Sequence, residues 1–486
     1  MLTSQGSASQ EAAPRFSIQS IDLFEREVRL RLPFRFGVVT LTESPQAFVR
    51  ARIRLEEGQM RGRESLGGAA ELLAPKWFDK DLALSNEDNF GQLRRSLAIA
   101  CTAYLSGGAN TAFGHFSAHY RAQIESCAKQ GLNSLIAGYG PALLDRALLD
   151  ALCRALDVSF YAAVRANLPV ADVSLTADLD GFDIGGFLGS LEPAASIAAR
   201  HTVGLVDPIT AADQSDRVGD GLPETLEEVV ARYGHHFFKL KVGGDIPGDV
   251  ARLGAIAAVL DRSREPYFAS LDGNEQYENV DGIAELWRRM TEAPALGRLV
   301  ASVLFIEQPI KRQNALAADV SALGRDRPVI IDESDDSLDA FARARSLGYA
   351  GVSSKTCKGL YKSLLNAARC AKWNSQGGKF FMSAEDLTIQ PGLALQQDLA
   401  LVNLLGITHV ERNGHHYVNG MASLPESEQR AFLGAHPDLY ESSHGATRVA
   451  IRNGRLAIGS LECPGYASRV LPDFVAMRAM KPSYRG

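Results

Sequence analysis

Three lysines stand where short apolar runs end in the central and later parts of the chain. Lys239 and Lys241 are separated by one residue, so in a strand both side chains point to the same side. Lys355 ends a similar run farther along. A lysine can take a proton from carbon when its pKa is near the working pH, and a neighbouring ammonium group lowers that pKa. The pattern therefore predicts acid–base chemistry, although a Lys-x-Lys pair is also typical of a solvated strand end.

Three carboxylates end the apolar runs that lie between these lysines. They are Asp272, Glu307 and Asp332. Such oxygen ligands, without cysteine or histidine nearby, suit Mg²⁺. Removal of a proton beside a carboxylate puts two negative charges on its oxygens, and a bound cation stabilises that charge. Each acid alone could instead cap a helix or end a strand. Their order on consecutive runs favours one metal site.

The runs alternate with helical segments from about residue 201 onward. We expect strands at 202–207, 236–242, 267–272, 303–307, 328–332, 351–355, 379–384 and 408–412. Eight strands with seven intervening helices predict an α/β fold with a closed parallel barrel, rather than an open doubly wound sheet. Catalytic side chains of such a barrel lie at the carboxyl ends of its strands, so the lysines and acids should meet there.

Other regions do not follow this alternation. Strands expected at 16–32, 47–58 and 59–65 are followed by helical periodicity over 85–166. A hairpin is expected around Asn453–Gly454. The predicted units are a disordered leader (1–15), an α+β capping domain (16–198), the barrel (199–418) and a C-terminal segment (419–486) that returns to the capping domain.

Composition and charge limit the kinds of partner. The 486 residues carry a formal net charge of −6, which disfavours nucleic acid as a partner but not a small anionic substrate. No apolar stretch approaches the roughly 18 residues of a membrane span. Six scattered cysteines form no CxxC pair, which predicts no disulfide framework and a cytoplasmic location.

Five short motifs carry a resemblance that covers nearly the whole chain. They are FKLK (238–241), LDGN (271–274), FIEQP (305–309), IDES (331–334) and SSK (353–355). In this order they resemble the muconate lactonizing enzyme subgroup of the enolase superfamily, in the mandelate racemase/muconate lactonizing enzyme family. The resemblance implies a modified (β/α)7β TIM-like barrel under a capping domain, with PFRF (33–36) in the place of the family's mobile loop. It also implies a homo-oligomer.

The resemblance implies roles for the lysines. Lys241 and Lys355 would act as acid and base on opposite faces of the substrate carbon. Lys239 would tune Lys241 and contact the substrate carboxylate. The seventh strand of mandelate racemase-like members carries a catalytic histidine, and FFMSAEDL (380–387) has none, so lysine chemistry is favoured.

It also implies roles for the acids. Asp272, Glu307 and Asp332 would bind Mg²⁺, with the choice between Asp332 and Glu333 left open. Asn274, Glu333 and Glu385 would lie behind the ligands and orient them. Segments 104–138, 172–198 and 420–447 lengthen the chain relative to a typical member. They would reshape the roof of the pocket, so no relative's substrate transfers directly.

Several activities remain open. Lysines on both faces of a carbon favour a racemase or epimerase acting on a small carboxylate. Dehydration of an acid sugar, or cycloisomerisation, would use the same enolate. Glu307 and Glu385 also lie where barrel glycosidases carry their acid and nucleophile, but that function leaves three lysines unexplained. A non-catalytic homologue is the last alternative.

Overall fold

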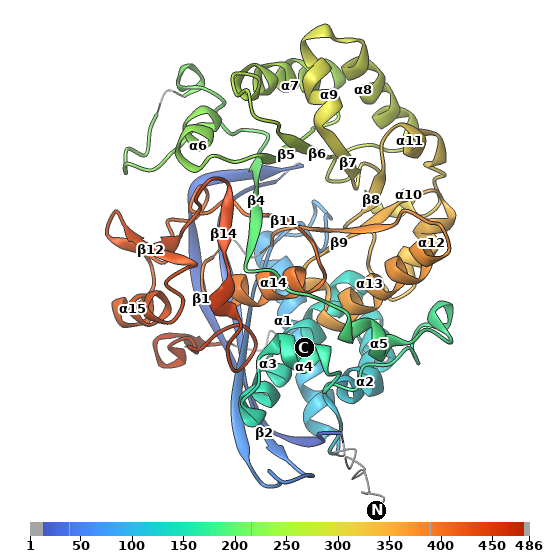
Figure 1. Ribbon diagram of the computed structural model, residues 1–486, viewed down its shortest axis with the longest axis vertical. Helices are drawn as coiled ribbons and strands as arrows, with labels where there is room; N and C mark the ends of the chain where they lie inside the picture. The colour runs from blue at the N-terminus through green and yellow to red at the C-terminus, as the bar shows by residue number, and fades with distance from the viewer. Residues whose placement is uncertain (1–12, 38, 215, 388–389, 481–486) are drawn as a thin grey trace, which may run out of the picture.

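A computed structural model describes residues 13–37, 39–214, 216–387 and 390–480. Most of the predicted leader therefore lies outside the described residues. Figure 1 shows the barrel strands in the middle of the molecule, between helices α7–α9 at one end and the N-terminal helices at the other. No helix of the described residues is long and apolar enough to cross a membrane.

Eight parallel strands form the barrel. They are β4 (Ser196–Val203), β5 (Phe237–Lys241), β6 (Phe268–Asp272), β7 (Val303–Glu307), β8 (Val329–Ile331), β9 (Gly351–Ser354), β10 (Phe381–Ala384) and β11 (His409–Glu411). Each strand pairs with the next, and β11 pairs with β4, which closes the barrel. The predicted closed barrel is confirmed.

The first barrel strand lies earlier than predicted. The expected strand at 202–207 is wrong, because β4 ends at Val203. The backbone N–H of Gly204 donates to Asp207 Oδ2 at 2.8 Å, so residues 204–207 form a turn instead. The apolar run that pairs with β5 therefore begins at Ser196.

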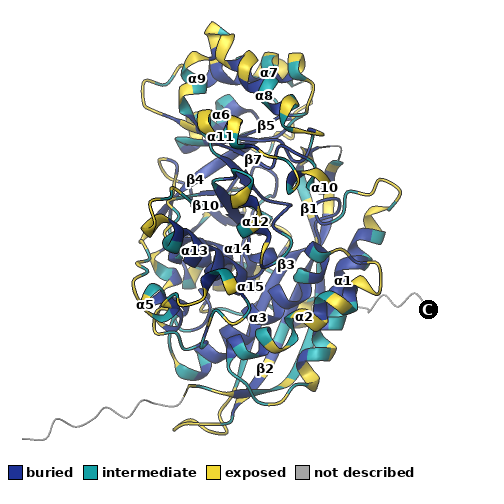
Figure 2. Cartoon of the chain, turned by 90° about the vertical axis from the view of Figure 1, so that its right-hand side faces the viewer, coloured by how far each residue is buried: buried dark blue, intermediate teal, exposed yellow. Residues whose placement is uncertain are grey.

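Helices cover the outside of the barrel. They are α6 (Leu226–Tyr233), α7 (Ile246–Leu260), α8 (Val280–Glu292), α9 (Gly297–Ser302), α10 (Arg312–Ala315), α11 (Ser321–Asp326), α12 (Ala340–Ser346), α13 (Leu360–Ser375) and α14 (Leu393–Leu404). Helix α8 buries Ile283, Leu286, Trp287 and Met290, which recur at helical spacing on one face. Figure 2 shows buried strands and helices whose outer faces are exposed.

The N-terminal region is an antiparallel sheet packed on helices. The sheet consists of β1 (Phe16–Phe36), β2 (Val39–Leu55) and β3 (Glu64–Leu72). The helices are α1 (Asn86–Ser106), α2 (Ala112–Ala128), α3 (Ser134–Leu156), α4 (Phe160–Arg165) and α5 (Ile184–Gly189). The hairpin between β1 and β2 reaches the mouth of the barrel, where Phe34 pairs with Leu41.

The third strand of this sheet lies later than predicted. Residues 59–65 were expected to be a strand, but most of them form a turn, with positive φ at Gly58 and Gly62. Strand β3 contains Gly67, where a Cβ would lie 2.2 Å from the backbone oxygen of Ala147 in α3. Helix α3 therefore packs directly on the backbone of β3, and glycines replace the apolar side chains that mark a strand in a sequence.

The C-terminal segment contacts both regions. It contains α15 (Glu426–Ala435), β12 (Tyr440–Ser443), β13 (Ala446–Val449), β14 (Arg455–Ala457) and β15 (Arg478–Ala479). The turn at Asn453–Gly454 is present, with positive φ at both residues. Arg452 and Arg455 pair antiparallel across this turn, with a backbone hydrogen bond of 3.0 Å in each direction, so the predicted hairpin is present but short. Beyond it the chain diverges, because β13 pairs with β12 and β14 pairs with β4. Strand β15 pairs with β1 of the capping sheet.

Candidate active site

The nine predicted site residues are all buried at the carboxyl ends of the barrel strands. Lys239 lies on β5 and is surrounded by acids. Its Nζ is 2.8 Å from Asp272 Oδ2, 2.9 Å from Glu307 Oε1, 2.7 Å from Glu385 Oε2 and 3.1 Å from Glu411 Oε2. One ammonium group therefore joins acids from four different strand ends.

The other two lysines come from opposite sides of the barrel. Lys241 ends β5, and its Nζ is 2.5 Å from Asp272 Oδ2 and 2.6 Å from Asn274 Oδ1. Lys355 follows β9, and its Nζ is 2.6 Å from Asp332 Oδ2. Four steps along the strand order separate β5 from β9 in the closed barrel of eight. Since both lysines line the same cavity, they enter it from opposite walls.

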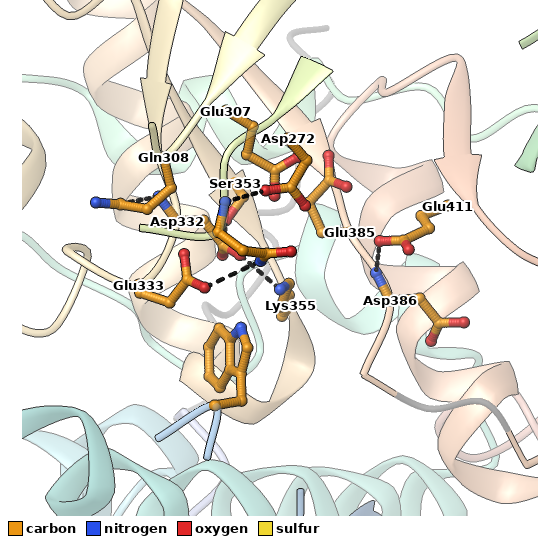
Figure 3. Close-up of polar contacts among 12 residues, drawn as sticks. Asp272, Glu307, Gln308, Asp332, Glu333, Ser353, Lys355, Glu385, Asp386 and Glu411 are labelled. Atoms are coloured by element: carbon orange, nitrogen blue, oxygen red, sulfur yellow. Dashed lines mark hydrogen bonds and ion pairs between the residues drawn. The ribbon is translucent and has the colours of Figure 1, made fainter. Parts of the chain in front are cut away.

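The three predicted metal ligands do not all share a partner. Asp272 and Glu307 both contact Lys239, whereas Asp332 contacts Lys358. Asp332 also contacts Lys355 and Ser353 (Figure 3). Among the residues that the structure describes, no group of three histidine, cysteine or acid side chains is arranged around one point to hold an ion. Each of the three acids is paired with an ammonium group instead.

The chemistry of the cluster nevertheless fits a divalent cation. Glu307 Oε2 and Glu333 Oε2 are buried and have no hydrogen-bond partner. Burial raises the pKa of Glu307 well above its usual range, and the nearby carboxylates of Asp272 and Glu385 raise it further. Burial also raises the pKa of Glu333. Unpartnered oxygens in a surplus of buried acid groups are what a hard cation satisfies.

Neighbouring carboxylates raise the pKa of Lys239 and of Lys355. Burial by itself lowers the pKa of Lys239, but Asp272, Glu307, Glu385 and Glu411 together raise it well above its usual value. Burial likewise opposes the charge of Lys355, and Asp332 outweighs it and raises the pKa. The Lys-x-Lys pattern predicts that one lysine of the pair has a lowered pKa, and Lys239 is not that lysine, because four acids surround it.

The strand-end acids differ in the direction of their pKa shifts. Although burial opposes ionisation, Lys355 and Lys358 hold the pKa of Asp332 well below its usual range. Lys239 and Lys241 lower the pKa of Asp272 in the same way. The pKa shifts of Asp272 and Asp332 therefore run in the opposite direction to those of Glu307 and Glu333.

Asn274 and Glu385 lie where the sequence places supporting residues. Asn274 Oδ1 accepts from Lys241, and its Nδ2 donates to Glu333 Oε1 at 3.2 Å. Asn274 has a φ of 39°, a left-handed conformation that asparagine tolerates better than most residues. Glu385 contacts Lys239 and the buried Arg200.

Sequence reasoning missed several residues of the site. Glu411 ends β11 and could have been found by applying the strand-end rule to the last strand. Gln308 was noticed only as part of a motif. Its Oε1 accepts from the backbone N–H of Asp332 at 2.8 Å and of Ser334 at 3.1 Å, which fixes the end of β8. Lys358 and Trp77 lie in connections that carry no periodic signal.

The paired histidines lie away from this site. His235, His415 and His416 are buried, and none of them lines the cavity that contains the lysines. His416 Nε2 is 3.6 Å from Asp207 Oδ2. These histidine side chains therefore lie outside the candidate active site.

Comparison with known proteins identifies the class. Residues 221–465 match the family model described as enolase C-terminal domain-like, which covers half of the chain. The chain therefore belongs to the enolase superfamily and is of the mandelate racemase/muconate lactonizing enzyme type. Members of this superfamily are enzymes and generally bind a divalent metal. A search of the curated proteins found no match.

Solved structures share the whole fold at low identity. The muconate lactonizing enzyme from Pseudomonas fluorescens, complexed with muconolactone, is 17% identical with a TM-score of 0.58, covering 95% of this chain and 99% of that chain. The 2-chloromuconate cycloisomerase from Rhodococcus opacus is 15% identical with a TM-score of 0.58, covering 96% and 100%. The L-Ala-D/L-Glu epimerase from Bacillus subtilis is 16% identical with a TM-score of 0.55, covering 93% and 98%.

Proposed function

We propose that the protein is a Mg²⁺-dependent racemase or epimerase that removes the proton next to a substrate carboxylate. The observation that carries the proposal is the placement of Lys241 and Lys355, which enter one cavity from opposite walls of the barrel. An acid and a base on opposite faces of one carbon can remove a proton from one side and return it on the other. Dehydration or cycloisomerisation of a carboxylate is the alternative on the same residues.

In this proposal Asp272, Glu307 and Asp332 hold the Mg²⁺ ion. When bound, the ion supplies positive charge that stabilises the enolate and offsets the acids that raise the lysine pKa. Asn274 orients the Lys241 ammonium group through its amide oxygen at 2.6 Å. Lys239 holds the acid cluster together and presents a fixed positive charge toward the substrate carboxylate.

The lysines carry the proton transfers. Lys355 is held by a single carboxylate contact to Asp332 at 2.6 Å, and Lys241 by contacts to Asp272 and Asn274. Each Nζ lies at the cavity wall, where a substrate α-carbon can approach it. Burial of both side chains excludes bulk water from competing for the proton.

The glycosidase alternative conflicts with the charges. Lys239 Nζ lies between Glu307 Oε1 and Glu385 Oε2, at 2.9 Å and 2.7 Å. A cation between the two acids disfavours the positively charged transition state of glycoside cleavage. The cytoplasmic location, the homo-oligomer and the lack of a nucleic-acid partner remain predictions, and light scattering would test the oligomer.

Hydrogen exchange at the α-carbon tests the proposal. The purified protein is incubated with Mg²⁺ and a panel of chiral carboxylates in D₂O, and exchange and inversion are followed by NMR and chiral chromatography. We expect exchange with inversion that EDTA stops and added Mg²⁺ restores. Inversion that persists in Lys241→Ala, or activity that is indifferent to EDTA, would contradict it. Formation of a 2-keto product would favour dehydration.

A further inference from the structure

The cavity above the lysines has two chemically different halves. Its barrel half is lined by Lys239, Lys241, Asn274, Lys355, Asp386, Leu387 and Glu411. Its capping half is lined by Phe34, Phe36, Leu41, Leu72, Ala74 and Trp77. Among the described residues, every side chain that the capping region gives to this cavity is apolar or aromatic.

The apolar half is held in place by specific contacts. Phe34 and Leu41 are paired across the β1–β2 hairpin, and the Phe34 ring lies 4.5 Å from the ring of Tyr417. The loop that carries Trp77 is fixed by Arg312, which donates to the carbonyls of Trp77 at 2.7 Å and Phe78 at 2.8 Å. These contacts hold the apolar side chains of the capping half in fixed positions.

Trp77 adds one polar feature to this wall. It is 3% exposed, and its Nε1–H has no hydrogen-bond partner. Its ring also lies against Lys355, with 4.3 Å between Nζ and the ring centroid. A buried indole N–H without a partner can satisfy one acceptor on a bound molecule.

We propose, on the basis of the proposed function, that the substrate is a carboxylate whose distal part is uncharged and apolar. The lysines take the carboxylate end, and the aromatic wall takes an aliphatic or aromatic side chain with at most one hydrogen-bond acceptor toward Trp77. A second charge or a row of hydroxyl groups would lose its water in this half and find no matching partners. The cavity thus favours a racemase of apolar acids over a dehydratase of acid sugars.

A matched substrate series tests this inference. N-acetylated phenylalanine, leucine, glutamate and lysine share one reacting carbon and differ in the distal group, and gluconate represents the polyhydroxy acids. We expect kcat/KM for α-hydrogen exchange to be about 100-fold higher for the phenylalanine and leucine compounds. Preference for the glutamate, lysine or gluconate compound would overturn the inference.

Variants locate the preference in the wall. Phe34→Arg places a cation in the capping half and should reduce the phenylalanine-to-glutamate ratio at least about tenfold. Val475→Arg is the control, because Val475 is 93% exposed and lies outside the cavity. Phe34→Leu, which keeps the wall apolar, should retain the preference if Phe34→Arg fails to fold. An unchanged ratio in folded Phe34→Arg would contradict the assignment.

Binding separates this inference from the proposed function. Isothermal titration of the same acids into the Mg²⁺-loaded protein reports the preference without turnover. Tighter binding of the apolar acids with no exchange would refute the reaction and support the substrate class. Exchange with tighter binding of charged acids would support the reaction and refute the substrate class.

Discussion

The two halves of the cavity use opposite chemistry on one substrate. The barrel half packs lysines and acids into buried ion pairs, such as Lys239 with Glu307 at 2.9 Å. The capping half consists of aromatic rings and aliphatic side chains. The Phe34 ring centroid lies 5.8 Å from Lys241 Nζ, and the Trp77 ring centroid lies 4.3 Å from Lys355 Nζ. Under the proposed function, the comparison teaches that reaction type and substrate choice are carried by separate parts of the chain. Each part can then be changed while the other is left intact.

The largest effect should come from the barrel half. Lys355→Ala removes one of the two opposed amines, and we expect kcat for inversion at the α-carbon to fall about 10³-fold. Mg²⁺ binding, measured by titration calorimetry, should persist because the metal ligands remain. Loss of Mg²⁺ binding in a folded variant would show that the lysine supports the metal site rather than the chemistry. Lys372→Ala, at the outer end of α13, is a matched control.

The second largest effect should be on the stability of the protein, and it should come from the capping region. Glu71 ends β3 in the capping sheet, where burial raises its pKa from 4.5 to about 7 although Arg146 opposes the shift. A carboxyl with a raised pKa binds its proton more tightly in the folded state, so its contribution is present below pH 4.5 and is lost as pH rises to about 7. The free energy of unfolding, compared with that of Glu71→Gln, should fall by roughly 3 kcal/mol over this range.

Urea unfolding at the two ends of this pH range measures the effect. Glu43→Gln provides the control, because the Glu43 side chain is 65% exposed. A wild-type minus variant difference that does not change with pH would show that Glu71 is not protonated in the folded protein.

A smaller effect should come from the contact that joins the halves. Arg312 lies beyond β7, binds Glu275, and donates to the carbonyls of Trp77 and Phe78. Arg312→Ala should release the Trp77 loop and raise KM for apolar acids about tenfold, with little change in kcat. Arg288→Ala, which removes an exposed ion pair with Glu285, should leave KM unchanged. A fall in kcat alone would show that Arg312 supports the reaction step rather than substrate binding, and would contradict the division between the two halves of the cavity.

The smallest effect should come from the loss of a single hydrogen-bond donor in the capping half. Trp77→Phe keeps a ring against Lys355 and removes the unpartnered Nε1–H. For acids with an acceptor in the distal part, kcat/KM should fall roughly fivefold, the size of one neutral hydrogen bond. Acids without that acceptor should not change, and Trp287→Phe, in helix α8, should affect neither. An equal loss for both substrate types would assign Trp77 to packing alone.

The same division explains what the sequence could predict. Lys239, Asp272 and Glu307 stand at strand ends one βα unit apart, so the barrel rule alone brings them together. No comparable rule predicts which residues line the capping half of the cavity. Phe34 and Trp77 reach the cavity through a hairpin and a loop whose positions depend on contacts such as Arg312 to Trp77, distant in sequence.

The charge environment of the lysines also could not be predicted from the sequence pattern. A Lys-x-Lys pair suggests mutual repulsion, but Lys239 meets four acids, and Glu411 comes from the far end of the barrel sequence. The position of β3 could not be predicted from apolar alternation, because glycines such as Gly67 replace apolar side chains there. Gly67 allows α3 to pack on the strand backbone. Strand type could be read from local pattern, whereas charge state and close backbone packing depend on residues far apart in the chain.

The pairing of β15 with β1 has a consequence for how the molecule forms. Arg478 contacts Glu25 across 453 positions of the chain, and β14 borders the barrel at β4. During synthesis the edge of the first sheet therefore stays open until the entire barrel has emerged, because its partner strand comes after the barrel in chain order. Contacts of such long range form slowly. A pulse-labelling experiment should find amides of β1 near Phe24 among the last to gain protection from exchange.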